Sequence, residues 1–217
     1  ASCLVGSEMC IRDSLMGDET LVARGGCPMN CHYCPFEKDS DGKPTQPRSY
    51  LSTEPGNKRA TEHHHHPLGQ TLSRLFQLEM LGHISNDQSK PNKIEFIISG
   101  GTFNFYPRDY IIWFTTCAYY ACNVYHQLNK NKGDITKIRP MDSLEYEQLM
   151  NETSSNRMIG LTIETRPDYV TPKKKNGIDF SQLSLFREIG VTRVQVGVQS
   201  TKDDVLKKVN RGCTSRD

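Results

Sequence analysis

Residues 26–35 read Gly-Cys-Pro-Met-Asn-Cys-His-Tyr-Cys-Pro, and this motif directs the interpretation of the whole chain. Its three cysteines, Cys27, Cys31 and Cys34, come directly after the apolar run Leu21–Ala23. Iron–sulfur clusters normally have four protein ligands, so three thiolates can bind three irons of a four-iron cluster and leave the fourth iron open. A metal with an open position is typical of a catalytic site. The motif therefore predicts an iron–sulfur centre that binds a substrate.

Two other interpretations of the motif compete with this one. A structural zinc site usually has a fourth ligand and pairs of ligands spaced as C-x2-C. His32, or one of the consecutive histidines at 63–66, is available as that ligand. The three thiols can also be unrelated to any metal. For residues 63–66 themselves, a solvated polar run is the alternative to a metal or RNA contact.

The length and composition are those of one soluble domain. The 217 residues can form a single hydrophobic core, since one core serves up to about 250 residues. The net charge is +2, the mean hydropathy is -0.61, and no apolar run approaches the roughly 20 residues that span a bilayer. Eight cysteines are too few for a disulfide scaffold, and the clustered triplet indicates a reducing compartment, the cytoplasm or the nucleus. We expect Cys117 and Cys122 to be neutral core thiols in a helix.

The two ends of the chain suggest a fragment. The sequence begins with Ala1 rather than Met and stops after Thr-Ser-Arg-Asp without a closing element. The segment Cys3–Ser14 resembles a translated sequencing adaptor, so it is left out of the fold prediction. We expect residues 1–14 to be adaptor-derived or disordered and residues 15–217 to form one domain that is incomplete at its C-terminus.

Strand-like and helical runs alternate along the chain, which is the pattern of βα units and a parallel sheet. Their near-continuous apolar character suits strands that are covered on both faces. The expected strands are Glu19–Ala23, Ile94–Ile98, Ile159–Ile163 and Arg193–Val198.

Helix signals fill the intervals between these strands. We expect helices through Leu68–Phe76 with a stop at Gly82, from Pro107 through Tyr119, from a capping box of Asp142 and Glu145, from Asp179 to Gly190, and from a cap of Thr201 with Asp204. The stretch Pro35–Pro67 lacks periodicity and is expected to be a long loop, which is uncommon unless the loop has a function.

Every candidate ligand motif follows an expected strand, at the edge where parallel barrels gather their ligands. The glycines of Ser99–Thr102 let the backbone approach a ligand closely, although a Gly-Gly pair alone is more often a plain turn. Glu164 and Arg166 at the third strand end can hold a ribose diol and an anionic group, or form a salt bridge with each other. Gln199 after the fourth strand has both a donor and an acceptor, which suits ribose hydroxyls.

Five motifs in order carry a resemblance to a known family. They are the cysteine motif, Arg48-Ser-Tyr-Leu-Ser-Thr-Glu-Pro55, Lys93-Ile-Glu-Phe-Ile-Ile-Ser-Gly-Gly-Thr-Phe103, Gly160-Leu-Thr-Ile-Glu-Thr-Arg-Pro-Asp168 and Gly197-Val-Gln-Ser200. The cysteine spacing resembles the radical S-adenosylmethionine (SAM) superfamily. The whole set, from Leu21 to Gly212, is similar to the radical SAM half of the Elongator catalytic subunit, the family that modifies the wobble uridine of tRNA.

The resemblance implies a fold, cofactors and site residues. The fold would be a partial (β/α) barrel truncated after about four βα units. Cys27, Cys31 and Cys34 would hold a 4Fe-4S cluster, and Tyr33 would shield one face of it. SAM would have its methionine part near Gly100, Gly101 and Thr102 and its ribose near Glu164 and Gln199.

The resemblance also implies an activity and partners. A deoxyadenosyl radical made from SAM would abstract hydrogen from the acetyl group of acetyl-CoA, and the product would be a carboxymethyl-type group at C5 of the uridine. Acetyl-CoA would be bound mainly by a C-terminal acetyltransferase domain that this sequence does not contain, so activity of the chain by itself is not expected. The partners would be tRNA and other Elongator subunits, with no membrane.

The chain departs from the family at several points. The spacing C-x3-C-x2-C is tighter than in eukaryotic Elongator, and Cys213 stands where the family usually has His. Basic clusters, Lys173–Lys175 and Lys207, Lys208 and Arg211, are either tRNA phosphate contacts or solvated surface. The rival functions are another radical SAM enzyme, similar to a porphyrinogen oxidase, and a zinc-stabilised RNA-binding module.

Overall fold

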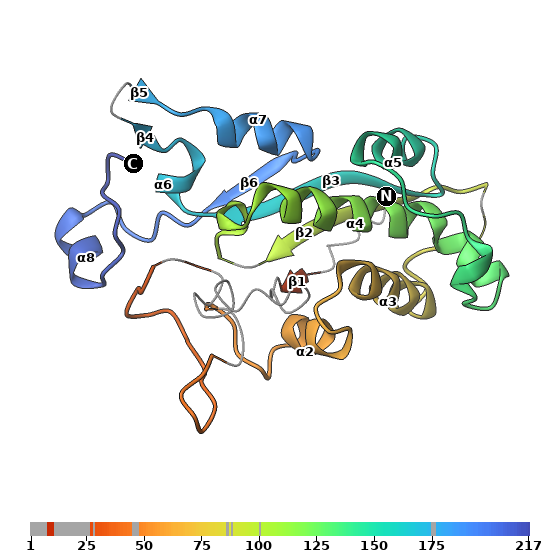
Figure 1. Cartoon of the computed structure of the whole chain (residues 1–217), viewed down its shortest axis with the longest axis horizontal. Coiled ribbons are helices and arrows are strands. Elements are labelled where there is room, and N and C mark those ends of the chain that lie inside the picture. Colours follow the sequence, from red (N-terminus) through yellow and green to blue (C-terminus); the bar gives the residue numbers. More distant parts are fainter. Residues whose placement is uncertain are drawn as a thin grey trace.

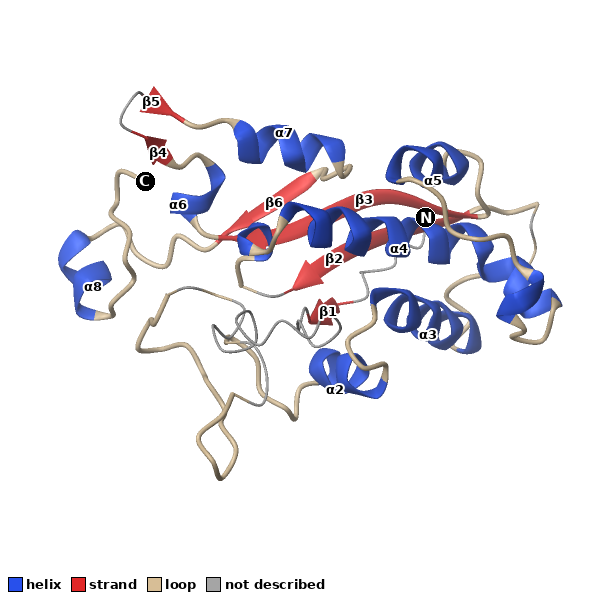
Figure 2. Ribbon diagram, in the orientation of Figure 1, coloured by secondary structure: helices blue, strands red, loops and turns tan. Residues whose placement is uncertain are grey.

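The computed structural model of the chain describes residues 8–10, 27, 29–44, 48–85, 87, 89–99, 101–174 and 177–217. The expected first strand Glu19–Ala23 lies outside the described residues, as do Gly100 and Lys175. Figure 1 shows the course of the chain and Figure 2 its helices and strands. No helix in the described part is long and apolar enough to cross a membrane.

The elements alternate between strands and helices, as the sequence predicts. In chain order they are β1 Glu8–Cys10, α2 Pro55–Glu62, α3 Pro67–Met80, β2 Asn92–Ser99, η1 Phe103–Phe105, α4 Arg108–Lys130, η2 Ile135–Lys137, α5 Leu144–Asn151, β3 Asn156–Thr165, α6 Pro167–Val170, β4 Lys173–Lys174, β5 Gly177–Ile178, α7 Ser181–Glu188, β6 Arg193–Val196 and α8 Asp203–Lys208.

The main sheet contains four parallel strands in the order β1-β2-β3-β6. Ile98 of β2 lies opposite Ile163 of β3, and Glu164 of β3 lies opposite Gln195 of β6. All four strands therefore end at one edge of the sheet (Figure 1). This parallel α/β arrangement confirms the predicted fold class, a partial barrel. A separate two-stranded hairpin, β4–β5, lies outside the sheet.

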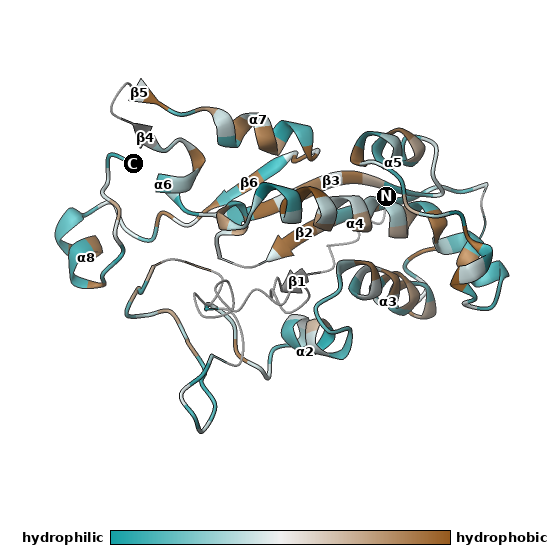
Figure 3. Ribbon diagram, in the orientation of Figure 1, coloured by the Kyte–Doolittle hydropathy of each residue, from teal (hydrophilic) through white to brown (hydrophobic). Residues whose placement is uncertain are grey.

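The main hydrophobic core lies between the sheet and the helices in front of it in Figure 1. Phe96 and Ile98 of β2 and Leu161 and Ile163 of β3 pack there with side chains of α4, α5 and α7. Figure 3 shows the hydrophobic colour concentrated on β2 and β3. These strands are predictable because their central residues are mostly apolar. The prediction that both faces of these strands are covered was wrong, however, because Glu95 and Ile97 are only half-buried and Ile159 is exposed.

The structure corrects several local predictions. The expected loop Pro35–Pro67 contains helix α2, which starts at Pro55, a residue whose fixed φ suits the first helical turn. Helix α5 is capped by Ser143, whose hydroxyl accepts the Tyr146 N–H, and not by Asp142. Helix α8 starts after Lys202 without a side-chain cap, so the predicted cap at Thr201 was wrong.

Two further differences concern the strands. Strand β6 ends at Val196, two residues before the predicted end, because the chain turns at Gly197 toward the left-handed Gln199. Strand β1, at the edge of the sheet, comes from the segment that was left out of the fold prediction. The proposed domain boundary after residue 14 stays a prediction.

Helix α4 carries the two cysteines that were assigned to the core. Cys117 and Cys122 are both buried. Burial raises the pKa of each thiol to about 12, so both are neutral at physiological pH. They take no part in the cysteine motif described below.

Candidate functional site

A cavity of about 420 Å³ lies at the carboxyl ends of β2, β3 and β6. It is the place where parallel α/β folds bind ligands, because strand ends and the loops after them converge there. Seven of the eight predicted site residues line it, and the eighth, Gly100, lies outside the described residues. The seven are Cys27, Cys31, Cys34, Gly101, Thr102, Glu164 and Gln199. Their roles as ligands of a cluster or of SAM stay predictions.

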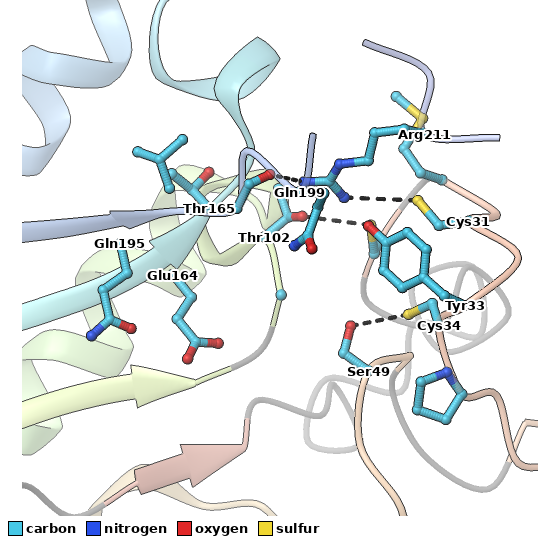
Figure 4. A pocket seen from close by; sticks show the side chains of 16 residues that line it. Cys31, Tyr33, Cys34, Ser49, Thr102, Glu164, Thr165, Gln195, Gln199 and Arg211 are labelled. Atoms are coloured by element: carbon cyan, nitrogen blue, oxygen red, sulfur yellow. Dashed lines mark hydrogen bonds between the residues drawn. The ribbon is translucent and has the colours of Figure 1, made fainter. Parts of the chain in front are cut away.

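The cysteines form one wall of this cavity. Figure 4 shows Cys31 and Cys34 on one side and Glu164 on the opposite side. The Cys34 sulfur lies 3.1 Å from the Ser49 hydroxyl, and the Cys27 sulfur lies 3.5 Å from the Thr102 hydroxyl. Each of these two thiols therefore has one neutral hydrogen-bond partner.

Cys31 has a different environment, with two guanidinium groups. Arg166 Nη1 and Arg211 Nη1 each donate to the Cys31 sulfur, both at 3.7 Å. Burial by itself would raise the pKa of the Cys31 thiol, but the hydrogen bonds from Arg211 and Tyr33 and the two positive charges outweigh it. The pKa of Cys31 is therefore lowered, which favours the thiolate that metal binding requires.

The opposite wall is formed by polar residues at the ends of β3 and β6. Tyr50 donates its hydroxyl hydrogen to the Glu164 carboxylate at 3.0 Å. Gln195, the strand partner of Glu164, lines the same cavity. Gln199 reaches the cavity from a left-handed backbone with φ of 66°. This wall offers carboxylate and amide groups suited to a polyhydroxylated ligand.

Arg166 contacts an aspartate and the cysteine side of the cavity. Arg166 binds the Asp168 carboxylate through Nε and Nη2 at 2.9 and 3.1 Å. Its side chain is 1% exposed and lies on the cysteine side of the cavity rather than facing an incoming ligand. The assignment of Arg166 to an anionic ligand group stays a prediction.

The histidines at 63–66 connect α2 and α3. His66 caps α3, since its Nδ1 accepts the Leu68 N–H, and its ring packs edge-on against Trp113. His64 and His65 adopt left-handed conformations in the turn between the helices. This segment has a structural function in the fold, which neither of the two sequence interpretations anticipated.

The donor set of the cavity fits an iron–sulfur cluster. In the described part of the chain, no three His, Cys, Asp or Glu side chains surround one point closely enough to hold a single metal ion. Zinc needs such a point, because its ligands all lie about 2.0–2.3 Å from it. A four-iron cluster binds each thiolate through a different iron, so its ligands lie further apart. Three thiols on one wall, with guanidinium groups beside them, suit the anionic cluster.

The model of the radical SAM superfamily matches residues 22–217, and the chain belongs to this superfamily. Membership implies a 4Fe-4S cluster and SAM as cofactors. A tRNA uridine(34) acetyltransferase of Methanocaldococcus infernus is 35% identical over 192 residues, which cover 88% of this chain and 30% of the relative. Elongator complex protein 3 of Homo sapiens is 35% identical over 184 residues, which cover 85% of this chain and 28% of the relative.

A solved structure agrees with these relatives. The archaeal Methanocaldococcus infernus Elp3 with an N-terminal deletion superposes with a TM-score of 0.58 at 33% identity and covers 72% of this chain. The aligned part is 30% of that structure. The chain therefore spans about a third of the length of the relatives it matches.

Several residues that line the cavity were not assigned to the site from the sequence, among them Ser49, Gln195 and Arg211. Ser49 stands in a quoted motif without an assigned role, Gln195 was treated only as part of a strand, and Arg211 was grouped with surface lysines. Arg211 is in fact buried. Its position between Asn210 and Gly212, residue types that favour left-handed turns, was a usable signal.

Proposed function

We propose that this chain is the SAM-binding domain of an enzyme that modifies C5 of the wobble uridine in tRNA, of the Elongator catalytic type. The observation that carries the proposal is the single cavity that joins three thiols on one wall to Glu164 and Gln199 on the other. The name of the archaeal relative, a tRNA uridine(34) acetyltransferase at 35% identity, supports the substrate class, and the human relative, Elongator complex protein 3, supports the Elongator type.

The proposed cofactors divide the cavity between them. Cys27, Cys31 and Cys34 would hold the 4Fe-4S cluster, and Glu164 and Gln199 would bind the ribose hydroxyls of SAM. When bound, the cluster and SAM together supply radical chemistry that no amino-acid side chain can perform. The residues of this chain position the two groups and, since the cavity lies between strand ends and the cysteine loop, limit the access of water.

The proposed tRNA and acetyl-CoA contacts extend beyond this cavity. Lys207 and Lys208 of α8 are exposed and suit phosphate contacts, whereas the buried Arg211 does not. Acetyl-CoA would bind mainly to a further domain, and the relatives are long enough to contain one in addition to the aligned part. Other Elongator subunits would be partners of that larger protein. The compartment would be the cytoplasm or the nucleus, where thiols stay reduced.

The proposal is tested by anaerobic reconstitution followed by assays of the reconstituted chain. The parent should bind about four irons with matching sulfide, as a thiolate-ligated cluster requires, and Cys31→Ala should lose them. Cys117→Ala is the matched control, because that thiol is buried elsewhere and should leave the iron content unchanged. Stoichiometric zinc without iron would contradict the proposal.

The same preparations test the substrate. We expect the chain with dithionite to release little deoxyadenosine. A fusion to the C-terminal part of the archaeal relative should also convert wobble uridine, detected by nucleoside mass spectrometry of tRNA. Iron and SAM binding without any tRNA modification by the fusion would leave the superfamily assignment intact and favour a different radical SAM reaction.

A further inference from the structure

The three thiols of the cysteine motif have unequal surroundings. Cys27 and Cys34 each have a hydroxyl partner, from Thr102 and Ser49. Cys31 has two guanidinium donors and is the most buried of the three. Of the three predicted cluster ligands, Cys31 is therefore the one with two positively charged neighbours.

Each of the two arginines is fixed by groups other than the thiol. Arg166 is held by two hydrogen bonds to Asp168, and its Nη2 also donates to the Arg211 carbonyl at 2.6 Å. Arg211 donates from Nη2 to the Gly197 carbonyl at 2.5 Å. Both guanidinium groups are therefore aimed at Cys31 before a cluster binds.

The charges of this group do not balance without an anion at Cys31. Asp168 neutralises one of the two arginines, which leaves an excess of one positive charge beside the sulfur. A buried charge without a counter-charge is costly, since its lost hydration is not repaid. The Nε of Arg211 has no hydrogen-bond partner in the described part of the chain. The pair is therefore arranged to receive negative charge at the sulfur.

Charge and hydrogen bonds at ligand sulfurs have a defined effect on iron–sulfur clusters. Reduction adds negative charge, so nearby positive charge stabilises the reduced form and raises the reduction potential. Groups that hold a ligand in place also increase metal retention, typically by 10- to 100-fold. A reduced cluster is what the radical SAM reaction requires.

We propose that Arg211, together with Arg166, is a positioning residue that fixes Cys31 and raises the reduction potential of the cluster. The inference rests on the proposed cluster at Cys27, Cys31 and Cys34. It assigns a function to the Asn210-Arg-Gly212 turn, which brings the last part of the chain to the cysteine loop. Arg211 acts through Cys31 and does not need to contact SAM.

The test compares four reconstituted forms of the 217-residue chain: the parent, Arg211→Lys, Arg211→Gln and Lys202→Gln. Lys202 is exposed at the start of α8 and gives the matched loss of one positive charge away from the sulfur. The midpoint potential is measured by redox titration with electron paramagnetic resonance, and iron retention by the rate of release to a chelator. Circular dichroism checks that each form is folded.

The expected order is specific. Arg211→Gln should have a more negative potential than the parent and retain iron roughly 10- to 100-fold less well. Arg211→Lys keeps the charge but loses the planar fork of donors that holds the sulfur and Gly197 O in a fixed geometry, so its potential should fall between the two. Lys202→Gln should match the parent. If Arg211→Gln does not fold, the shift of Arg211→Lys relative to Lys202→Gln decides the question.

Two outcomes would overturn the inference, and only one of them would also overturn the proposed function. A parent that binds four irons, with both Arg211 variants equal to Lys202→Gln in potential and iron release, would overturn this inference alone. A parent that binds no iron would overturn the proposed function as well.

Discussion

Gln199 holds a left-handed backbone with φ of 66°, a conformation that non-glycine residues rarely adopt. Its neighbour Gly197 makes room for it, because a Cβ at Gly197 would lie 3.0 Å from Gln199 Nε2 and 3.2 Å from Arg211 Nη2. Strained residues of this kind concentrate at functional sites, where the surrounding structure holds them. The strained backbone of Gln199 thus directs its side-chain amide to the cavity.

Glu164 and Gln199 should contribute to SAM affinity without affecting the cluster. Glu164→Gln removes a charged acceptor, and hydrogen bonds to charged groups are worth about 1.5–3 kcal/mol, so we expect roughly 10- to 100-fold weaker binding. Gln199→Ala loses a neutral hydrogen bond of about 1 kcal/mol, or about fivefold. SAM binding is measured by equilibrium dialysis on protein with verified iron content.

The control for this prediction is Glu152→Gln, which changes an exposed carboxylate just before the start of β3, whereas the cavity lies at the end of that strand. It should leave SAM affinity unchanged. Affinity within twofold of the parent for both Glu164→Gln and Gln199→Ala would contradict the ribose assignment.

At the scale of elements, helices α3 and α7 end in the same way. Each is followed by a left-handed glycine, Gly82 with φ of 75° and Gly190 with φ of 81°. The space around the two differs. A Cβ at Gly82 would meet nothing within 4 Å, whereas one at Gly190 would lie 2.3 Å from the Tyr119 hydroxyl. Substituting alanine at Gly82 therefore tests the cost of the left-handed backbone alone, and at Gly190 it tests that cost together with a steric clash.

Gly82→Ala should lower the free energy of unfolding by about 1–2 kcal/mol, the cost of a left-handed alanine. Gly190→Ala should lose that amount and a further 1–3 kcal/mol for overpacking against the buried Tyr119 ring. Urea denaturation measures both values. Adding Tyr119→Phe to Gly190→Ala removes the clashing oxygen and should recover part of the loss. Equal losses for the two alanine variants would show that α7 shifts freely at its end.

Much of the element pattern could be predicted from the sequence, for identifiable reasons. Strands β2 and β3 have mostly apolar runs, and Pro107 is the N-cap residue of α4, so composition and local signals suffice. Helix α2 was missed because its residues are mostly polar and its N-terminal signal is the single Pro55. The cysteine wall was predictable from local spacing. The contact between Cys31 and Arg211 could not be predicted, because 180 positions separate the two residues in the sequence.

At the scale of the whole molecule, β6 ends the sheet order in the described part of the chain. Val196 is 40% exposed and Val198 is 48% exposed beside this strand. An exposed apolar edge is a template for pairing with another chain. The cavity and a surface prone to association therefore lie on the same strand.

Val198→Lys should reduce self-association of the chain, because a lysine beside an edge strand opposes pairing with a second copy. Val205→Lys adds the same charge to α8 at a residue of similar exposure, 39%, and should have a smaller effect. Static light scattering over a concentration series measures the association. An equal decrease for both variants would indicate net charge rather than the strand edge as the cause.

The contact between the Asn210 side chain and the Asn30 carbonyl, like that between Arg211 and Cys31, joins residues 180 positions apart. The entropic cost of closing a loop grows with its length, and long-range contacts form late in folding. The cysteine loop therefore takes its final shape only after helix α8 and the turn that follows it have been synthesised and docked. During translation the thiols would emerge long before Arg211, so delivery of the proposed cluster would have to wait until Arg211 has been synthesised or rely on a carrier that protects the loop until then.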